Sequence, residues 1–141
     1  MSNFNGGGVT TQANLEVVFD HLYARRLRDL ARVESQLDPN VVHQGVLPEL
    51  VCNNSDEVLE NVRRSFARDD FGVERLEMIE AGEQVVVGLG GPRFLEVPWA
   101  PLKGQIYMVF TLRDGRIVRM DDYLTRADAM AAVGGAARDW A

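Results

Sequence analysis

Apolar residues recur at helical spacing near the start of the chain. They predict an amphipathic helix that ends or bends within residues 24–29. The stripe consists of Leu15, Val18, Phe19 and Leu22, with Tyr23 on its flank. His21 lies off this stripe, so we expect it to be solvated.

Three further patterns follow this first helix. Leu30, Val33 and Leu37 predict a short second helix that stops at the Asp-Pro-Asn sequence of residues 38–40. Residues 41–46, VVHQGV, are rich in β-branched side chains and predict a short strand.

A capping box predicts the start of a third helix, because Glu57 follows Asn54 by three residues. An apolar stripe extends this helix over residues 55–68, and its members are Val58, Leu59, Val62 and Phe66.

From Val73 onward the apolar positions change to the alternation of β-strands. The expected strands are residues 73–80, 84–91, 105–112 and 116–124, and a helical turn or two follows in residues 125–133. Asp114 and Gly115 form a turn sequence typical of a β-hairpin. Helices followed by antiparallel strands predict an α+β fold, in which a curved sheet wraps around the helices.

Length and composition indicate one globular domain. We expect a mobile segment at residues 1–12, a single domain at residues 13–134 and a tail at residues 135–141, in a chain of 141 residues. No apolar run approaches the roughly 18 residues of a membrane span, and the first residues do not resemble a signal peptide. We therefore expect a cytoplasmic protein.

The charge and the cysteine content argue against some classes of partner and of site. The net charge of −6 argues against nucleic acid as a partner, since clustered cations would be needed. Cys52 is the only cysteine, and we interpret it as a small buried apolar residue. Two distant histidines and one cysteine provide no metal-ligand spacing, and we expect neither a metal nor a cofactor.

Two segments carry a resemblance to a known family. Residues 24–46, ARRLRDLARVESQLDPNVVHQGV, and residues 108–130, MVFTLRDGRIVRMDDYLTRADAM, resemble the SnoaL-like branch of the nuclear transport factor 2-like superfamily. The resemblance implies a cone: N-terminal helices pack in the concave face of a strongly curved, mixed, mostly antiparallel sheet, around an internal apolar pocket. It also implies a homodimer through the outer sheet face, where Tyr107, Val109, Ile117 and Tyr123 would form an apolar patch.

Strand alternation places the two neighbouring aspartates on opposite faces of the last strand, and the resemblance assigns one of them to the pocket. Asp122, directly before a tyrosine, would point into the pocket, whereas Asp121 would lie outside beside Arg119. If the register of residues 41–46 follows the family, His43 faces Asp122 across the pocket. The other pocket residues would be Leu22, Tyr23, Gln84, Val86, Trp99, Ile106, Met108, Phe110, Met120 and Leu124.

The resemblance leaves two functions open. The first is a proton-transfer enzyme of the cyclase or isomerase type, which acts on an apolar ring or polyketide-like molecule with Asp122 and His43. The second is a non-catalytic module that binds a hydrophobic ligand or dimerises. Epoxide hydrolysis is doubtful because Gln84 and Val86 stand where related hydrolases have an arginine and a second aspartate. Ketosteroid isomerisation is doubtful because Gln44 and Gly45 stand where an aspartate base would be.

Overall fold

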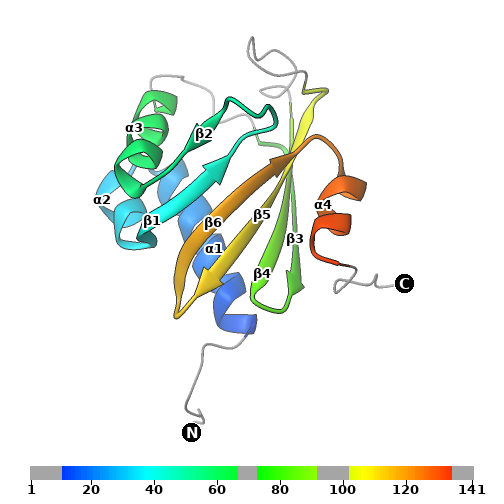
Figure 1. Ribbon diagram of the computed structural model, residues 1–141, viewed down its shortest axis with the longest axis horizontal. Helices are drawn as coiled ribbons and strands as arrows, with labels where there is room; N and C mark the ends of the chain where they lie inside the picture. The colour runs from blue at the N-terminus through cyan, green and yellow to red at the C-terminus, as the bar shows by residue number, and fades with distance from the viewer. Residues whose placement is uncertain (1–10, 67–72, 92–101, 135–141) are drawn as a thin grey trace, which may run out of the picture.

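The structure is a computed structural model that describes residues 11–66, 73–91 and 102–134. Its helices are α1 (Thr11–Arg26), α2 (Leu30–Ser35), α3 (Ser55–Ser65) and α4 (Arg126–Ala132). Its strands are β1 (Leu37–Gln44), β2 (Val51–Cys52), β3 (Arg75–Ala81), β4 (Gln84–Gly90), β5 (Gln105–Arg113) and β6 (Arg116–Tyr123) (Figure 1). Residues 1–10, which make up most of the expected mobile segment, lie outside the described residues, as does the tail at residues 135–141.

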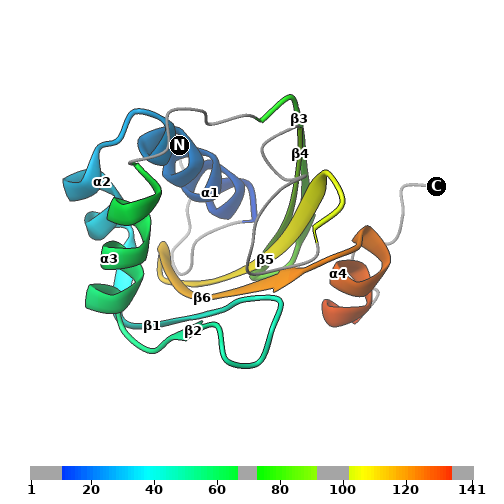
Figure 2. The ribbon, with the colours of Figure 1, turned by 90° about the horizontal axis from the view of Figure 1, so that it is seen from above.

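The six strands form one mixed sheet in the order β2-β1-β6-β5-β4-β3. Only the pairing of β1 with β6 is parallel, and the other neighbours are antiparallel. The sheet bends around α1, while α4 lies on its opposite face (Figure 2). The predicted α+β fold with helices in a curved, mostly antiparallel sheet is therefore confirmed.

The hairpin between β5 and β6 forms at the predicted sequence. Asp114 and Gly115 both adopt positive φ angles, of 52° and 78°. Two such residues in succession are what the common two-residue hairpin turn requires. This turn starts β6 opposite β5, so that Arg116 pairs with Arg113.

The main core lies between the concave face of the sheet and helices α1 to α3. Its fully buried members include Val18 and Val33 from the helices and Phe110, Ile117 and Met120 from the sheet. Ile117 was expected on the outer face, and that prediction is wrong. Between the pairs Thr111–Arg119 and Leu112–Ile117, β6 contains one extra residue, Val118. Such a bulge reverses the facing of the residues before it.

The outer face of the sheet carries a second, smaller core under α4. Val86 and Val109 pack there with Ala129 of α4 and with Val133, which follows that helix. The cluster also contains Ile79, Ala81, Tyr107, Tyr123 and Met130. The outer apolar patch expected to form a dimer interface is thus covered within the chain, since Val109 is only 1% exposed. A homodimer stays a prediction, without support from this patch.

Helix α1 packs on the core with Leu15, Val18 and Leu22 of the predicted stripe, but its fourth member, Phe19, is exposed. Phe19 and Tyr23 are 52% and 49% exposed, whereas His21, expected to be solvated, is completely buried. The buried side follows Asn14, Val18, His21 and Leu22, which also have helical spacing. Because Asn14 and His21 are polar, the pattern of apolar residues did not indicate that they lie on the buried side.

The second helix ends earlier than expected. Ser35 is its last residue, and Leu37, predicted to be helical, is the first residue of β1. Leu37 pairs with Ile117, and the backbone N–H of Ile117 donates to the Gln36 carbonyl over 2.9 Å. Pairing with β6 therefore outweighs the helical spacing of Leu37. Within the described residues, no helix is long and apolar enough to cross a membrane.

The predicted cap of α3 is present. The Asn54 side chain accepts a hydrogen bond of 2.9 Å from the Glu57 backbone, and the Glu57 carboxylate accepts one of 2.7 Å from the Asn53 backbone. The helix covers residues 55–65, three residues fewer than the predicted range of 55–68. Residues 67 and 68 lie outside the described part of the chain.

This cap gives a test of the fold. We expect Asn54→Ala to lower the free energy of unfolding by about 1 kcal/mol, because a backbone N–H loses its acceptor. Asn53→Ala is the matched control, since Asn53 contributes its backbone N–H, which alanine retains. Urea unfolding of the two variants measures the difference, and equal stabilities would contradict the role of the cap.

Candidate functional site

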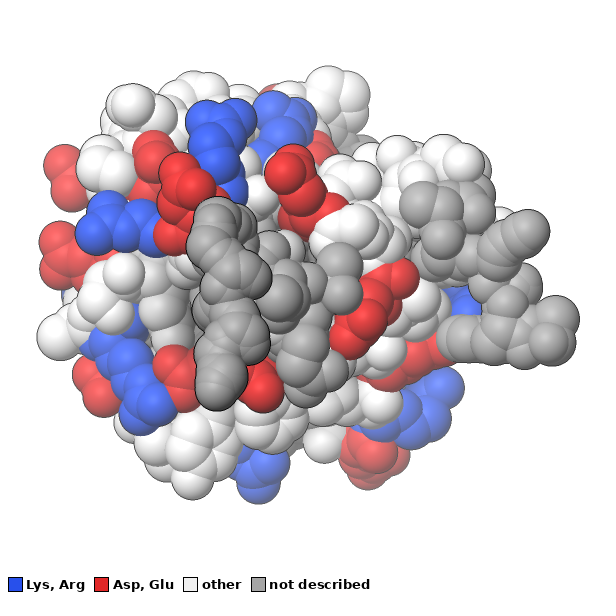
Figure 3. Space-filling view, turned by 90° about the horizontal axis from the view of Figure 1, so that it is seen from below, with Lys and Arg blue, Asp and Glu red and all other residues white. Residues whose placement is uncertain are grey.

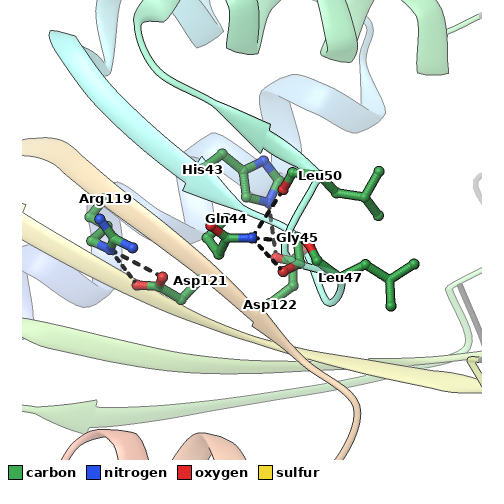
Figure 4. A network of polar contacts seen from close by, with 8 residues as sticks. All are labelled: His43, Gln44, Gly45, Leu47, Leu50, Arg119, Asp121 and Asp122. Atoms are coloured by element: carbon green, nitrogen blue, oxygen red, sulfur yellow. Dashed lines mark hydrogen bonds and ion pairs between the residues drawn. The ribbon is translucent and has the colours of Figure 1, made fainter.

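The parallel pairing of β1 and β6 brings the two predicted catalytic residues together. His43 is opposite Met120, and Asp122 lies two residues further along β6 on the same face. His43 Nε2 and Asp122 Oδ1 are 2.9 Å apart, and each side chain is 12% exposed (Figure 4). A histidine and a carboxylate thus form a hydrogen-bonded pair at the edge of the inner face.

Asp121 lies on the other side of β6 and belongs to a separate ion pair. Both of its carboxylate oxygens accept from Arg119 Nε, over 3.1 and 2.9 Å. The Arg119 side chain is 47% exposed, so this pair is on the surface. The two neighbouring aspartates therefore have different surroundings: one beside an imidazole, the other beside a guanidinium (Figure 4).

Apolar side chains of β5 and β6 surround the pair on the inner face. Met108 is opposite Asp122, and Phe110 is opposite Met120. All three apolar residues are at least 95% buried. Leu22 of α1 belongs to the same core, and Ile106, half-buried, continues the inner side of β5. These predicted lining residues lie on the expected face.

Three other predicted pocket residues, Gln84, Val86 and Tyr23, lie elsewhere. Gln84 and Val86 face outward: the Gln84 amide donates to Thr111 Oγ1 over 3.0 Å, and Val86 packs under α4. Tyr23 is on the exposed side of α1. Leu124 follows the end of β6, and its backbone carbonyl accepts from Gln105 Nε2 over 3.1 Å. Trp99 lies outside the described residues.

Gly88 lies on the same outer side of β4 as Gln84 and Val86. Gly88 pairs with Tyr107 in an unbroken ladder, and a Cβ at position 88 would lie 2.5 Å from the Tyr107 ring. The glycine therefore provides room for an outer-face tyrosine. The inner face of β4 carries Val85, Val87 and Leu89. None of them is an arginine or a carboxylate, so β4 supplies no group that activates water for epoxide hydrolysis.

Cys52 is a neighbour of the pair that the sequence did not indicate. It lies opposite His43 in the antiparallel pairing of β1 with β2. Burial, together with the negative charges of Glu57 and Asp122, raises the pKa of the Cys52 thiol. It is therefore a neutral thiol packed against the core, which agrees with its predicted apolar character.

A side-chain amide organises the loop that follows His43. Gln44 Nε2 lies 3.0 Å from the Leu47 carbonyl, 3.2 Å from that of Gly45 and 3.3 Å from that of Leu50 (Figure 4). The loop also closes on itself, because the Gly45 N–H donates to the Leu50 carbonyl over 2.6 Å. Gln44 thereby fixes the end of β1 that carries His43.

The second histidine, His21, is enclosed between α1 and the sheet. Its Nδ1 lies 3.2 Å from Gln36 Oε1, and its ring meets that of Phe110 edge-on at 5.7 Å. Burial, aided by the charge of Arg25, lowers the pKa of His21 from 6.5 to about 3, and its hydrogen bond with Gln36 opposes this shift. The imidazole is therefore neutral at physiological pH.

The rest of the described chain contains no second pair of this kind that is joined to a metal-ligand cluster or a depression. Within residues 11–66, 73–91 and 102–134, no group of three or more His, Cys, Asp or Glu side chains could hold a metal ion. A surface depression between α1 and β3 is lined by Leu15, Glu16, Phe19, Asp20 and Met78, and it shares no residue with the His43–Asp122 pair. On the face seen in Figure 3, acidic and basic side chains are interspersed.

Solved structures show which class of fold this is. The protein has the nuclear transport factor 2-like fold, the α+β cone to which the two sequence segments pointed. An NTF2-like protein from Burkholderia xenovorans aligns with a TM-score of 0.64 and 14% identity, over 90% of this chain and 98% of that one. No family model matches the sequence, and no curated protein matches it.

Two of these neighbours have an activity in their names. A protein assigned as a polyketide cyclase from Sinorhizobium meliloti has a TM-score of 0.61 and 19% identity, over 77% of this chain and 94% of that one. An LEH-like epoxide hydrolase from M. tuberculosis has a TM-score of 0.61 and 20% identity, over 86% of this chain and 90% of that one. Identities this low establish the fold alone, and one fold carries many activities.

The buried His21 predicts a loss of stability in acid. The folded protein holds the imidazole neutral, while the unfolded chain takes up a proton near pH 6.5, so the stabilisation is present above that pH and lost toward pH 3. We expect the free energy of unfolding to fall by about 2 kcal/mol between pH 7.5 and pH 5 from this residue. Urea unfolding at both pH values, on wild type and His21→Leu, isolates the effect. Equal losses in the two proteins would contradict it.

The carbonyl cluster around Gln44 predicts a difference between two glutamine substitutions. Gln44→Glu would place carboxylate oxygens against backbone carbonyls and lower the free energy of unfolding at neutral pH by about 1–3 kcal/mol. Gln84→Glu is the matched control, because its side-chain partner, the Thr111 hydroxyl, can turn and donate to a carboxylate. Thermal unfolding at neutral pH compares them, and an equal effect would contradict the role of Gln44.

Proposed function

We propose that this protein is a small-molecule enzyme that transfers a proton on an apolar ring or polyketide-like substrate, with Asp122 and His43 as its catalytic residues. The observation that carries the proposal is the 2.9 Å contact between His43 Nε2 and Asp122 Oδ1. Imidazole and carboxylate are the groups most used for acid–base catalysis near neutral pH. The pair retains 12% exposure on each side chain, so a reacting molecule could approach it.

The chemistry assigned to the pair follows from its atoms. His43 uses Oδ1 of Asp122, which leaves Oδ2 to accept a proton from a carbon next to a substrate carbonyl. The imidazole holds the carboxylate in position by donating its N–H to Oδ1, and the proton taken up on Oδ2 is returned to another atom of the substrate. The substrate's own carbonyl would stabilise the carbanion, so no metal or cofactor is required by this step. The apolar neighbours Met108 and Met120 suit an apolar substrate.

A second candidate is a binding module without catalysis. It is favoured by the small number of polar groups on the inner face: β4 contributes Val85, Val87 and Leu89, and β5 contributes Met108 and Phe110. Asp122 would then be only a hydrogen-bonding group for a hydrophobic ligand. The same set of substitutions distinguishes the two functions.

The two adjacent aspartates provide a matched test of catalysis. Proton exchange with solvent at the acidic carbon of bicyclic 1,3-diketones can be followed by deuterium incorporation. We expect wild type to accelerate it, and Asp122→Asn to reduce the acceleration by about 100-fold or more, since the accepting oxygen is replaced. His43→Gln should reduce it by a smaller factor, because the carboxylate remains. Asp121→Asn should have wild-type activity.

The outcomes separate the functions clearly. Binding of the diketones without any acceleration by wild type would favour the binding module over the enzyme. A loss of activity in Asp121→Asn equal to that in Asp122→Asn would contradict the assignment of the two aspartates to different faces.

A further inference from the structure

His21 has an enclosed nitrogen for which the described residues supply no partner. Gln36 donates with its amide nitrogen to the Asp20 carboxylate, so its oxygen is the atom that faces His21 Nδ1. Nδ1 must therefore carry the ring proton and donate it to Gln36. The other nitrogen, Nε2, is then an unprotonated acceptor, and it is buried without a hydrogen-bond partner.

An unpartnered acceptor in a protein interior is costly and uncommon. Leaving such an atom without a donor costs about 1–3 kcal/mol, and most buried polar atoms have a partner. His21 is fully enclosed, so bulk water does not supply the donor. The tautomer is held by Gln36 and Asp20, which keep the lone pair on Nε2. The structure thus maintains an acceptor in a fixed place.

The position of this acceptor relates it to the His43–Asp122 pair. The His21 ring packs edge-on against Phe110 of β5. Phe110 pairs with Met120 of β6, and Met120 pairs with His43 of β1. His43 is also near enough to contribute, after burial and Arg25, to the lowered pKa of His21. Both histidines therefore belong to the inner face, one on α1 and one on β1, with apolar side chains around them.

We propose that His21 Nε2 accepts a hydrogen bond from a hydroxyl group of the molecule bound at the His43–Asp122 site. The inference rests on the proposed function and narrows its substrate class to apolar rings that carry a hydroxyl, such as phenols and enols. A site built to pair with a hydroxyl discriminates against analogues that lack the donor. His21 is then a specificity-determining residue, and Asp122 acts at another part of the same molecule.

Paired probes test this assignment by binding alone. 2-Naphthol donates a hydrogen bond, whereas 2-methoxynaphthalene has the same ring without the donor. By calorimetric titration we expect wild type to bind 2-naphthol about three- to tenfold more tightly. His21→Phe should bind the two compounds equally, and Tyr23→Phe, a change on the exposed side of the same helix, should keep the preference.

A measurement on wild type does not depend on how the variant folds. The chain has only two histidines, so their ring nitrogens can be distinguished by ¹⁵N NMR. 2-Naphthol should shift the unprotonated Nε2 of His21 upfield, and 2-methoxynaphthalene should leave it in place.

Each result has a defined consequence. A hydroxyl preference that persists in His21→Phe, or an Nε2 signal that 2-naphthol leaves unchanged, would overturn the role of His21 and leave the proposed function intact. Failure of wild type to bind either compound would overturn both, because the apolar site itself would be missing.

Discussion

The parallel pairing of β1 with β6 is the constraint on which the site depends. Side chains alternate along a strand, so a slip of one residue would turn His43 outward and present Val42 or Gln44 to Asp122. The register is held at the buried residues Leu37 and Val41. Between the pairs Leu37–Ile117 and Val42–Arg119, β1 advances five residues while β6 advances two. Pro39 lies in this irregular stretch, where its missing N–H disrupts no regular ladder.

The sequence predicted the elements of the fold well, because their signals are local. The Asp-Gly turn, the cap of α3 and the alternation of strands each depend on a few neighbouring residues. The face of the sheet to which each side chain points was predicted less well. Val85, Val86 and Val87 are all fully buried, since helices cover one side of β4 and α4 covers the other. A strand buried on both faces has no polar side, so its sequence cannot indicate which residues point inward.

Long-range contacts explain what the sequence could not indicate about the site. His43 and Asp122 are separated by 79 residues, and only the family resemblance placed them on one face. His21 escaped prediction because its partner, Gln36, comes from another element 15 residues away. A helical stripe defined by apolar residues alone passes over Asn14 and His21, although both are buried. Buried polar residues follow the same spacing, but their partners decide whether they can be inside.

The energetics of the His43–Asp122 pair favour a functional origin over a structural one. A partly buried pair of ionisable groups brings little net stability, and well-packed apolar residues often serve a fold equally well. The strand partners of the two residues, Met120 opposite His43 and Met108 opposite Asp122, are apolar and buried. The pair is also held from several sides: Gln44 fixes the loop after His43, and Cys52 packs opposite it. Such support maintains the geometry that acid–base chemistry requires, which stability alone would not demand.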